Sequence, residues 1–390
     1  MTDPPATGSE PSDSLTLIIT TSPTPSAPST ELLSDVLQSL RDHCPGLLSC
    51  RVTVVFDPYE RVAARPRLKK GQVTAAGAAA FAAYMANVKQ LVRDEFLGPH
   101  ARPAWHHTAA EAEYGLTART HGTVPLAITR TADGRVTFVE PALRLGFGLA
   151  VRSALRLADT PYVWVQQHDW ALASAVPLPA ILSIMAASTD APDLPVRYVA
   201  FPAGRMLSYA SSPHVRDFAA LSALTDRLGR VFVASPRPGP GKPASEEDDH
   251  GGPGADVPGV PLTPLFFWHD KPHVASTAHY LARVFPTAMA VQRGGFIEDG
   301  VGHRARDQMK RGEWHRWATW LYYPDDGTRL CLRHLQGRTW RGRTGESEAA
   351  RMWRARNAEA AVEATGAATC EGGDVDGRQG GDRPGTTIGR

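Results

Sequence analysis

The stretch "TPYVWVQQHDWALA", Thr160 to Ala173, begins as an apolar run and turns polar in its middle. Its first part, "YVWV", has the composition of a strand that is buried on both faces of a parallel sheet. The polar residues "QQHD", 166–169, follow at once, whereas a strand that merely ends is usually followed by Gly, Asn or Pro. Because carboxylate and imidazole groups bind metals, we expect a functional site where this strand ends.

Strand and helix patterns alternate on the N-terminal side of this stretch. Continuous apolar runs predict buried strands at "LTLIIT" (15–20), "CRVTVVFD" (50–57) and "RVTFVEP" (135–141). Apolar residues on one helical face predict helices at "PSTELLSDVLQSL" (28–40), "AAFAAYMANVKQLV" (79–92) and "GFGLAVRSALRLA" (146–158). This alternation predicts an α/β fold, with a mostly parallel central sheet flanked by helices.

Polar side chains stand where several of these strands end. Thr20 and Thr21 close the first strand, Asp57 closes the second, and His168 and Asp169 close the fourth. Ligands of such sheets bind beyond the carboxyl ends of the strands, so we expect these residues to share one site. The alternatives are ordinary strand-end hydroxyls for the threonines and a turn carboxylate before Pro58 for the aspartate.

Composition limits the class of protein. The chain has 390 residues, 42% of them apolar, and a net charge of +2, so it can form a sizeable core and has no charge excess that would suggest nucleic acid. It has no apolar run of roughly 18 or more residues and no basic-then-apolar N-terminus, and its four cysteines form no CxxC pair. These features predict a soluble, cytoplasmic protein, with import into an organelle left open.

Composition also indicates the domain boundaries. We expect one domain over residues 15–343, preceded by a disordered tail over 1–14. The Pro- and Gly-rich residues 236–260 predict a disordered insertion, and residues 344–390 predict a helix followed by a flexible tail.

The order of these motifs resembles the nucleotide-sugar-binding half of a glycosyltransferase of the A-type fold. The likeness is greatest to the family-two-like inverting enzymes of the nucleotide-diphospho-sugar transferase superfamily, and it covers Leu15 to Asp169 in order. It continues more loosely in "GGFIEDGVGH" (294–303) and "EWHRW" (313–317). The family's Asp-x-Asp motif falls on residues 167–169, where Gln167 replaces the first acid.

The resemblance implies a divalent cation, Mn²⁺ or Mg²⁺. Asp169 would be one ligand and His334, in "LCLRHLQGR", a second, because one or two carboxylates often suffice for Mg²⁺ when substrate phosphates and water complete the shell. His168 would favour Mn²⁺ if it were a ligand. The alternative is a metal-free site in which arginines neutralise the diphosphate.

The resemblance also implies a donor-binding set. Asp57 would accept a hydrogen bond from the base or ribose of the nucleotide, Thr20 and Thr21 would line the base pocket, and Gln167 and His168 would lie beside the donor. A further candidate is Arg152, one turn into the helix that Gly146 and Gly148 open, because helix starts bind phosphate.

Catalysis would need a carboxylate as general base for the acceptor hydroxyl. Asp299 and Glu298 are the candidates, and the resemblance favours Asp299. The alternative is that this acid pair forms a helix cap or a turn.

The segment "FFWHDKPHVASTAHY" (266–280) is the expected acceptor side. Trp268 would stack on a sugar ring, and Asp270 or His273 would bind its hydroxyls. Pro272 predicts a helix from Val274 onward, which argues against shared metal ligation by His269 and His273. The alternative is that the aromatic residues 266–268 pack into the core.

Residues 303–343 mix arginines with tryptophans. Such a mixture can bind RNA or a diphosphate and sugar, or form a solvated face above buried rings, and no RNA-binding module is recognisable, so no nucleic-acid partner is predicted.

The expected activity is that of a hexosyltransferase. It moves a sugar from a nucleotide-diphosphate donor to a hydroxyl of a glycan, lipid or protein, with metal assistance and with inversion, both of which the resemblance implies. Two alternatives stay open. One is an inactive member that binds nucleotide sugar or glycan, and the other is a nucleotidyltransferase, although "TTSPTPSAPST" (20–30) lacks the Gly-rich basic loop of that class.

Overall fold

The computed structural model describes residues 11–115, 120–189, 194–232, 259–287, 291–348 and 351–352. The chain divides into two units, Met1–Trp340 and Arg341–Arg390. In the second unit, residues 343–348 and 351–352 are helical, where the sequence predicts a helix. The predicted insertion over 236–260 lies outside the described residues except at its last two positions. The predicted tail also lies outside them up to residue 10, whereas Pro11–Ser14 form the short helix α1.

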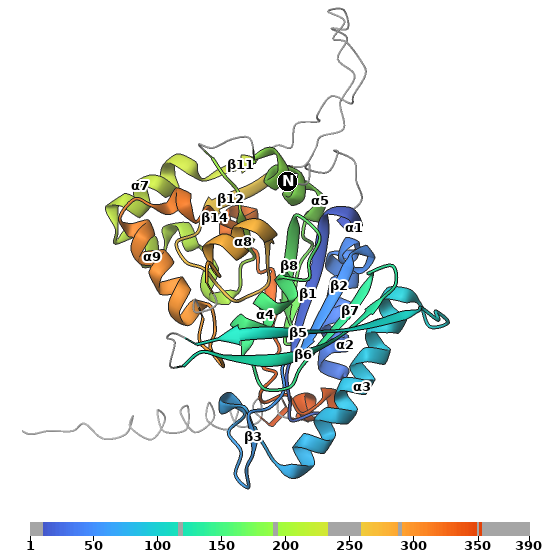
Figure 1. Ribbon diagram of the computed structural model, residues 1–390. Helices are drawn as coiled ribbons and strands as arrows, with labels where there is room; N and C mark the ends of the chain where they lie inside the picture. Colours follow the sequence, from blue (N-terminus) through green and yellow to red (C-terminus); the bar gives the residue numbers. More distant parts are fainter. Residues whose placement is uncertain are drawn as a thin grey trace, which may run out of the picture. The chain divides into compact units, whose positions relative to one another are not determined.

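An eleven-stranded sheet crosses the first unit (Figure 1). In spatial order its strands are β11 (Arg230–Phe232), β12 (Val260–Pro264), β14 (Thr319–Tyr322), β10 (Tyr198–Ala200), β13 (His273–Ser276), β8 (Tyr162–Gln167), β1 (Leu15–Thr21), β2 (Arg51–Phe56), β7 (Val136–Pro141), β6 (Gly122–Thr131) and β5 (Trp105–Tyr114). Two small sheets accompany it, β9 (Trp170–Leu172) with β15 (Leu332–His334), and β3 (Arg61–Val62) with β4 (Gln72–Val73).

The strands of this sheet run mostly in one direction. Parallel pairing joins β1 to β2, β1 to β8, β2 to β7 and β10 to β14. The other neighbours pair antiparallel, and tracing direction from strand to strand leaves only β6, β12 and β13 reversed, so eight of the eleven strands point the same way. The predicted α/β fold with a mostly parallel central sheet is confirmed.

The centre of the sheet is buried on both faces. Every residue of β1 is buried, as is every residue of β8 except the last, which matches the apolar runs in the sequence. Helix α4 (Phe147–Leu155) packs against β1 and β2 and is itself buried at all nine positions, while α3 (Ala75–Leu97) packs against β7. Helix α2 (Glu31–His43) buries the apolar face that the sequence predicts.

The remaining helices connect the outer strands. They are α5 (Leu178–Ala187), α6 (Pro213–Arg216), α7 (Ala219–Leu228), α8 (Thr277–Arg283) and α9 (His303–Lys310). Short helical turns are η1 (Pro45–Ser49), η2 (Leu68–Lys70), η3 (Gly204–Met206), η4 (Tyr209–Ser211), η5 (Glu298–Gly302), η6 (Trp314–Arg316) and η7 (Pro324–Gly327). Among the described residues, no helix combines the length and the apolar character needed to cross a membrane.

The helix predicted from Val274 onward does not begin there. Residues 273–276 instead form β13, which runs antiparallel to β8 and pairs His273 with Val165. Helix α8 begins at Thr277. Ser276 caps this helix, because its hydroxyl oxygen accepts a hydrogen bond from the backbone N–H of His279. Residues 273–276 are stabilised more by pairing between β8 and β10 than by the helix start that Pro272 predicts.

Candidate active site

A cavity of about 360 Å³ lies beyond the carboxyl ends of β1, β2 and β8. Since β13 is reversed, the loop before it reaches the same edge of the sheet. Of the thirteen residues that the sequence predicts for the site, nine line this cavity: Thr20, Thr21, Asp57, Gln167, His168, Asp169, Asp270, Glu298 and His334. The structure thus brings together residues from Thr20 to His334, which are 314 positions apart in the chain.

Gln166 shapes the turn that presents the polar residues. Its side chain is fully buried, its amide group donates to the backbone carbonyls of Gln167 (2.9 Å) and Trp170 (2.6 Å), and its oxygen accepts from the indole N–H of Trp164 (3.0 Å). Gln166 is therefore fully engaged in holding the turn between β8 and β9 and has no group left for a ligand.

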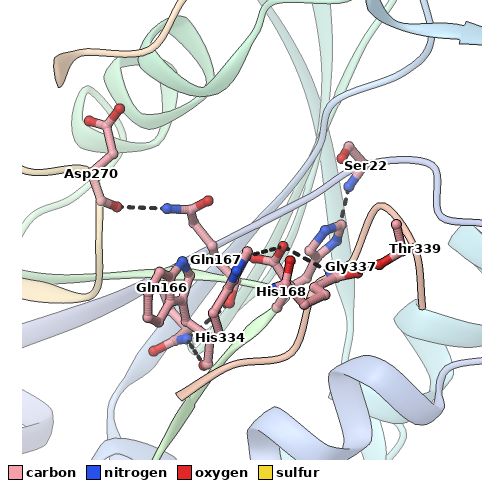
Figure 2. A network of polar contacts seen from close by, with 11 residues as sticks. Ser22, Gln166, Gln167, His168, Asp270, His334, Gly337 and Thr339 are labelled. Atoms are coloured by element: carbon pink, nitrogen blue, oxygen red, sulfur yellow. Dashed lines mark hydrogen bonds and ion pairs between the residues drawn. The ribbon is translucent and has the colours of Figure 1, made fainter. Parts of the chain in front are cut away.

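Gln167 occupies the place of the missing acid. Figure 2 shows its amide directed at the backbone of Asp270, to whose carbonyl oxygen the amide nitrogen donates over 2.8 Å. The side chain lines the cavity and also connects the end of β8 to the loop before β13. A carboxylate at this position would meet the same carbonyl without a proton to donate, so this loop contact suits an amide.

His168 is held in one tautomer. Its Nδ1 accepts the backbone N–H of Ser22 (3.3 Å) and lies 2.7 Å from the hydroxyl of Thr21, which in turn lies 2.7 Å from the hydroxyl of Tyr84. Because a backbone N–H can only donate, Nδ1 carries no proton, and Nε2 carries it in the neutral ring. Burial lowers the pKa of His168, despite the opposing charge of Asp169, so the ring is neutral and offers one N–H to a ligand.

Asp169 and His334 form a pair at the cavity wall. His334 Nε2 lies 3.1 Å from Asp169 Oδ2, which also accepts the backbone N–H of Gly337 over 3.2 Å. Burial alone would raise the pKa of Asp169, but the hydrogen bonds with His334 and Gly337 oppose it, and the pKa is lowered. The pairing of β15 with β9 sets Trp170 opposite His334, and the two rings stack with centroids 4.6 Å apart.

This pair fits a divalent cation in part. Among the described residues, no group of three or more His, Cys, Asp or Glu side chains is arranged to bind a metal. Asp169 and His334 supply one oxygen and one nitrogen donor, and Mg²⁺ or Mn²⁺ commonly completes its shell with ligand phosphates and water. The donor set therefore suits a cation that binds together with a phosphate ligand.

Asp57 fixes the turn before α4. Its Oδ1 accepts the backbone N–H groups of Leu145 (2.6 Å) and Gly146 (3.2 Å), and burial raises its pKa to about 6 against these hydrogen bonds. Gly146 has φ +81°, and a Cβ there would stand 2.4 Å from the Cα of Gly294. Only glycine fits this close approach, which joins the turn before α4 to the segment that leads to Glu298.

Glu298, not Asp299, lines the cavity. Both belong to the π-helical turn η5, but Asp299 is exposed. Burial would raise the pKa of Glu298, yet His269, with Nδ1 3.7 Å from Glu298 Oε2, and Lys271 outweigh it and lower that pKa. Of the two acids predicted as the base, Glu298 is thus the one that lines the cavity, and its lowered pKa favours the ionised form.

Three further predicted residues lie away from the cavity. The Arg152 side chain is 1% exposed and its guanidinium forms an ion pair with Glu113 at 3.7 Å, so the predicted phosphate contact is not available to it. Trp268 and His273 are fully buried and pack against Tyr198, with ring centroids 4.4 and 4.6 Å away. The predicted stacking of Trp268 on a sugar is wrong, because the apolar part of this loop is core, and of the three predicted acceptor residues only Asp270 lines the cavity.

Sequence reasoning missed several cavity residues. Four cationic side chains line the cavity, namely Lys69, Arg144, Lys271 and Arg338. Arg338 belongs to the basic region 303–343, for which the sequence leaves diphosphate binding open, whereas nothing in the sequence distinguishes the other three from the rest of the 42 lysines and arginines. Phe147 and Phe296 form an apolar wall with ring centroids 5.9 Å apart, and the Arg338 guanidinium lies 5.8 Å from the Phe296 ring.

The arginine- and tryptophan-rich region 303–343 mostly forms a solvated basic face above buried rings, which is one of the alternatives that the sequence leaves open. Trp314, Trp317, Trp320 and Trp340 are buried, while Arg304, Arg311, Arg316 and Arg333 are exposed. Of the arginines in this region, the cavity lining includes Arg338.

Comparisons with known proteins find distant similarity. No protein-family model matches the chain, and no curated protein matches its sequence. One similar solved structure is the mannosyltransferase PcManGT from Pyrobaculum calidifontis in complex with GDP-Man and Mn²⁺, at 13% identity and a TM-score of 0.33, covering 80% of this chain and 58% of that one. Another is TarS from S. aureus, at 11% identity and a TM-score of 0.25, covering 49% of this chain and 21% of TarS. The chain spans less than two thirds of either structure, and at this distance the function has to be inferred from the cavity itself.

Proposed function

We propose that the chain is a glycosyltransferase that moves a sugar from a nucleotide-diphosphate donor to an acceptor hydroxyl. The observation that carries the proposal is the cavity beyond β1, β2 and β8, where the Asp169–His334 pair, four cationic side chains and the ionised Glu298 converge. Sugar transfer needs these parts: positive charge at the leaving diphosphate, and a base for the hydroxyl that attacks.

The positive charge has two sources in this proposal. Asp169 and His334 would hold a divalent cation, which when bound neutralises the negative charge that develops on the leaving diphosphate. Lys271, Arg144 and Arg338 line the same cavity and orient the phosphates as fixed charges. A site that used these side chains without a metal is the competing form of the proposal.

The base in this proposal is Glu298. It is ionised, it lines the cavity, and its backbone is fixed at the start of η5. It would accept the proton of the acceptor hydroxyl as that oxygen attacks the sugar carbon from the side opposite the diphosphate, which gives inversion.

The nucleoside would lie against the ends of β1 and β2. There the neutral His168 offers its Nε2–H to the donor, and the buried Thr20, Thr21 and Asp57 shape the wall. Asp57 acts mainly on the turn before α4, because its oxygens already accept two backbone N–H groups.

A second candidate function is nucleotide-sugar binding without turnover. It is favoured by Gln167, whose amide replaces an acid of the resembled family and is engaged with the backbone of Asp270. Such a protein would bind the donor and release it unchanged.

A thermal-shift screen tests the proposal. UDP, GDP, CMP and their sugars are added to the full chain with Mn²⁺, with Mg²⁺ or with EDTA. A ligand at about one hundred times its dissociation constant stabilises the fold by about 2.7 kcal/mol. We expect one nucleotide class to stabilise the wild type in a metal-dependent way and to lose that effect in Asp169→Ala, while the exposed control Asp217→Ala keeps it.

Three other outcomes are informative. Stabilisation that EDTA leaves intact would favour the metal-free form of the site. A folded protein that responds to no nucleotide would overturn the proposed function, and binding without sugar release would identify the second candidate.

A further inference from the structure

Asp270 and Glu298 bind each other through two reciprocal hydrogen bonds. The backbone N–H of Asp270 donates to Glu298 Oε2 over 3.4 Å, and the backbone N–H of Glu298 donates to Asp270 Oδ2 over 3.3 Å. The two carboxyl groups thus come from different segments, the loop before β13 and the start of η5, and fix each other's position. Neither contact neutralises a carboxylate charge with a cation.

The two carboxyl groups differ in their surroundings. Asp270 is 3% exposed, whereas the Glu298 side chain is 38% exposed and has His269 and Lys271 as positive or polar neighbours. Asp270 faces the negative charges of Glu298 and Asp299, and burial followed by these charges raises its pKa well above the ordinary value. Lys271 is the nearby cation, and its strongest charge interaction is with Glu298 rather than with Asp270.

Asp270 also borders a group of buried rings. Tyr198, Trp268, His273 and Tyr280 pack on one another, with centroids 4.4 to 5.6 Å apart for their closest pairs. The carboxyl of Asp270 is near enough to contribute to the raised pKa values of both tyrosines. Within the described residues, Asp270 Oδ1, His273 Nε2, Tyr280 Oη and the indole Nε1 of Trp268 are buried and have no hydrogen-bond partner.

The tautomer of His273 leaves an acceptor in this group. His273 Nδ1 lies 2.7 Å from the carbonyl oxygen of Lys271 and donates to it, so Nε2 of the neutral ring carries a lone pair. The donors of the group are the Trp268 indole N–H and the Tyr280 hydroxyl. An ionised Asp270 would bring a buried negative charge beside them without an ion pair among the described residues, and buried charges are costly unless paired. A protonated Asp270 would bring no charge and would add one more donor to the group.

We propose that Asp270 is a protonated carboxylic acid at neutral pH and serves as the positioning residue of Glu298. Its Oδ2 accepts the Glu298 N–H and holds the carboxylate of Glu298 toward the cavity, while its proton keeps a second negative charge away from that base. Two close carboxyl groups that share one negative charge are a known solution to like-charge repulsion, and the buried member keeps the proton. The role in catalysis rests on the proposed function, but the protonation of Asp270 does not.

Carbon-13 NMR of the side-chain carboxyl groups tests the proposal on the ligand-free full chain. The signals are assigned by their loss in Asp270→Asn and in Glu298→Gln. We expect the Asp270 signal to stay at the position of a protonated acid through neutral pH and the Glu298 signal to be that of an ionised acid. In Asp270→Asn, the titration of Glu298 should not move, because an uncharged amide replaces an uncharged acid.

The opposite results would overturn the proposal. They are an Asp270 signal that titrates in the ordinary range of aspartates, or a Glu298 titration that shifts to lower pH in Asp270→Asn, as loss of a neighbouring anion requires. If Asp270→Asn does not fold, the wild type decides alone. Asp57 also has a raised pKa, so its signal is identified by its loss in Asp57→Asn. A further carboxyl that stays protonated above neutral pH would then be that of Asp270, and its absence would refute the assignment.

These measurements separate the two proposals. The NMR titration needs no nucleotide, so a negative thermal-shift screen leaves its result unchanged. A positive screen with an ionised Asp270 would keep the glycosyltransferase function and remove only the positioning role.

Discussion

Glu298 and Asp299 are adjacent acids, yet the first lines the cavity and the second is exposed. If Glu298 is the base, Glu298→Gln should lower the rate of sugar transfer by about 100-fold or more while donor binding persists. Asp299→Asn is the matched control and should retain the rate. The rates are to be measured with the donor that the thermal-shift screen identifies. The reverse result, an active Glu298→Gln and an inactive Asp299→Asn, would restore Asp299 as the base.

Gly337 leaves room for the carboxylate of Asp169. A Cβ at Gly337 would stand 2.9 Å from both Cβ and Oδ2 of Asp169, so Gly337→Ala has to displace that side chain. We expect Gly337→Ala to need about ten times more metal for the same nucleotide binding, because disturbing the residues around a metal ligand usually weakens metal affinity by that much. Gly204→Ala, where a Cβ meets no atom within 4 Å, is the control and should titrate with metal like the wild type.

The placement of polar residues at strand ends could be predicted from the sequence. Thr20, Asp57 and Asp169 line the cavity because each follows an apolar run that forms a parallel strand. Trp268 and His273 were assigned wrongly because their residue types suit a binding site and a core equally well, and only packing against Tyr198 decides between them. Of the cationic lining, Arg338 lies in the basic region that the sequence indicates, whereas Lys69, Arg144 and Lys271 could not be predicted, since an isolated cationic residue has no pattern that fixes its direction.

At the scale of elements, the pairing of β9 with β15 determines whether His334 reaches Asp169. Trp170 supports this arrangement through its stack on the His334 ring. Trp170→Ala should therefore weaken metal-dependent nucleotide binding by about 0.5–1.5 kcal/mol, and Trp170→Phe should restore most of it. Isothermal titration of the nucleotide in the presence of metal measures the difference. Equal affinities for all three proteins would show that the stack does not position His334.

The strands and helices that the sequence predicts before residue 170 are found close to their expected positions, although β5 and β6 were not predicted. Strand β13 was not predicted either. Its four residues, 273–276, are too few for a periodic signal, and Pro272 imitates a helix start. A short strand is stabilised by its two neighbours in the sheet, here β8 and β10, and these neighbours are remote in the chain. Long-range pairing of this kind leaves no local trace in the sequence.

At the scale of the whole molecule, stability should decrease as the solution is acidified below about pH 6.5. Burial lowers the pKa of four histidines, His168, His269, His273 and His279, so the unfolded chain binds protons in this range that the native chain does not. Two aspartates with raised pKa values, Asp57 and Asp270, have the opposite effect. Each stabilises the native state at low pH, and this contribution is lost as the pH rises through its native pKa.

The unfolded chain gains up to four protons on these histidines, whereas the native chain holds up to two more on the aspartates. The difference of two protons lowers the free energy of unfolding by at most about 3 kcal/mol for each pH unit of acidification. Chemical denaturation at a series of pH values measures it. A free energy of unfolding that increased from pH 6.5 toward about pH 4.5 would show that the histidines are not neutral in the native state.

The order of strands in the large sheet affects how the chain can fold during its synthesis on the ribosome. Strands β1, β2, β7 and β8 can pair as soon as they emerge, but β8 keeps an open edge until residues 273–276 have been made, and β14 must then enter between β12 and β10, which are already present. His334 arrives later still. A nascent chain therefore exposes an unpaired strand edge, which can associate with other chains, through much of its synthesis. Its cavity is complete only when nearly all of the first unit has been made. We therefore expect the growing chain to bind chaperones.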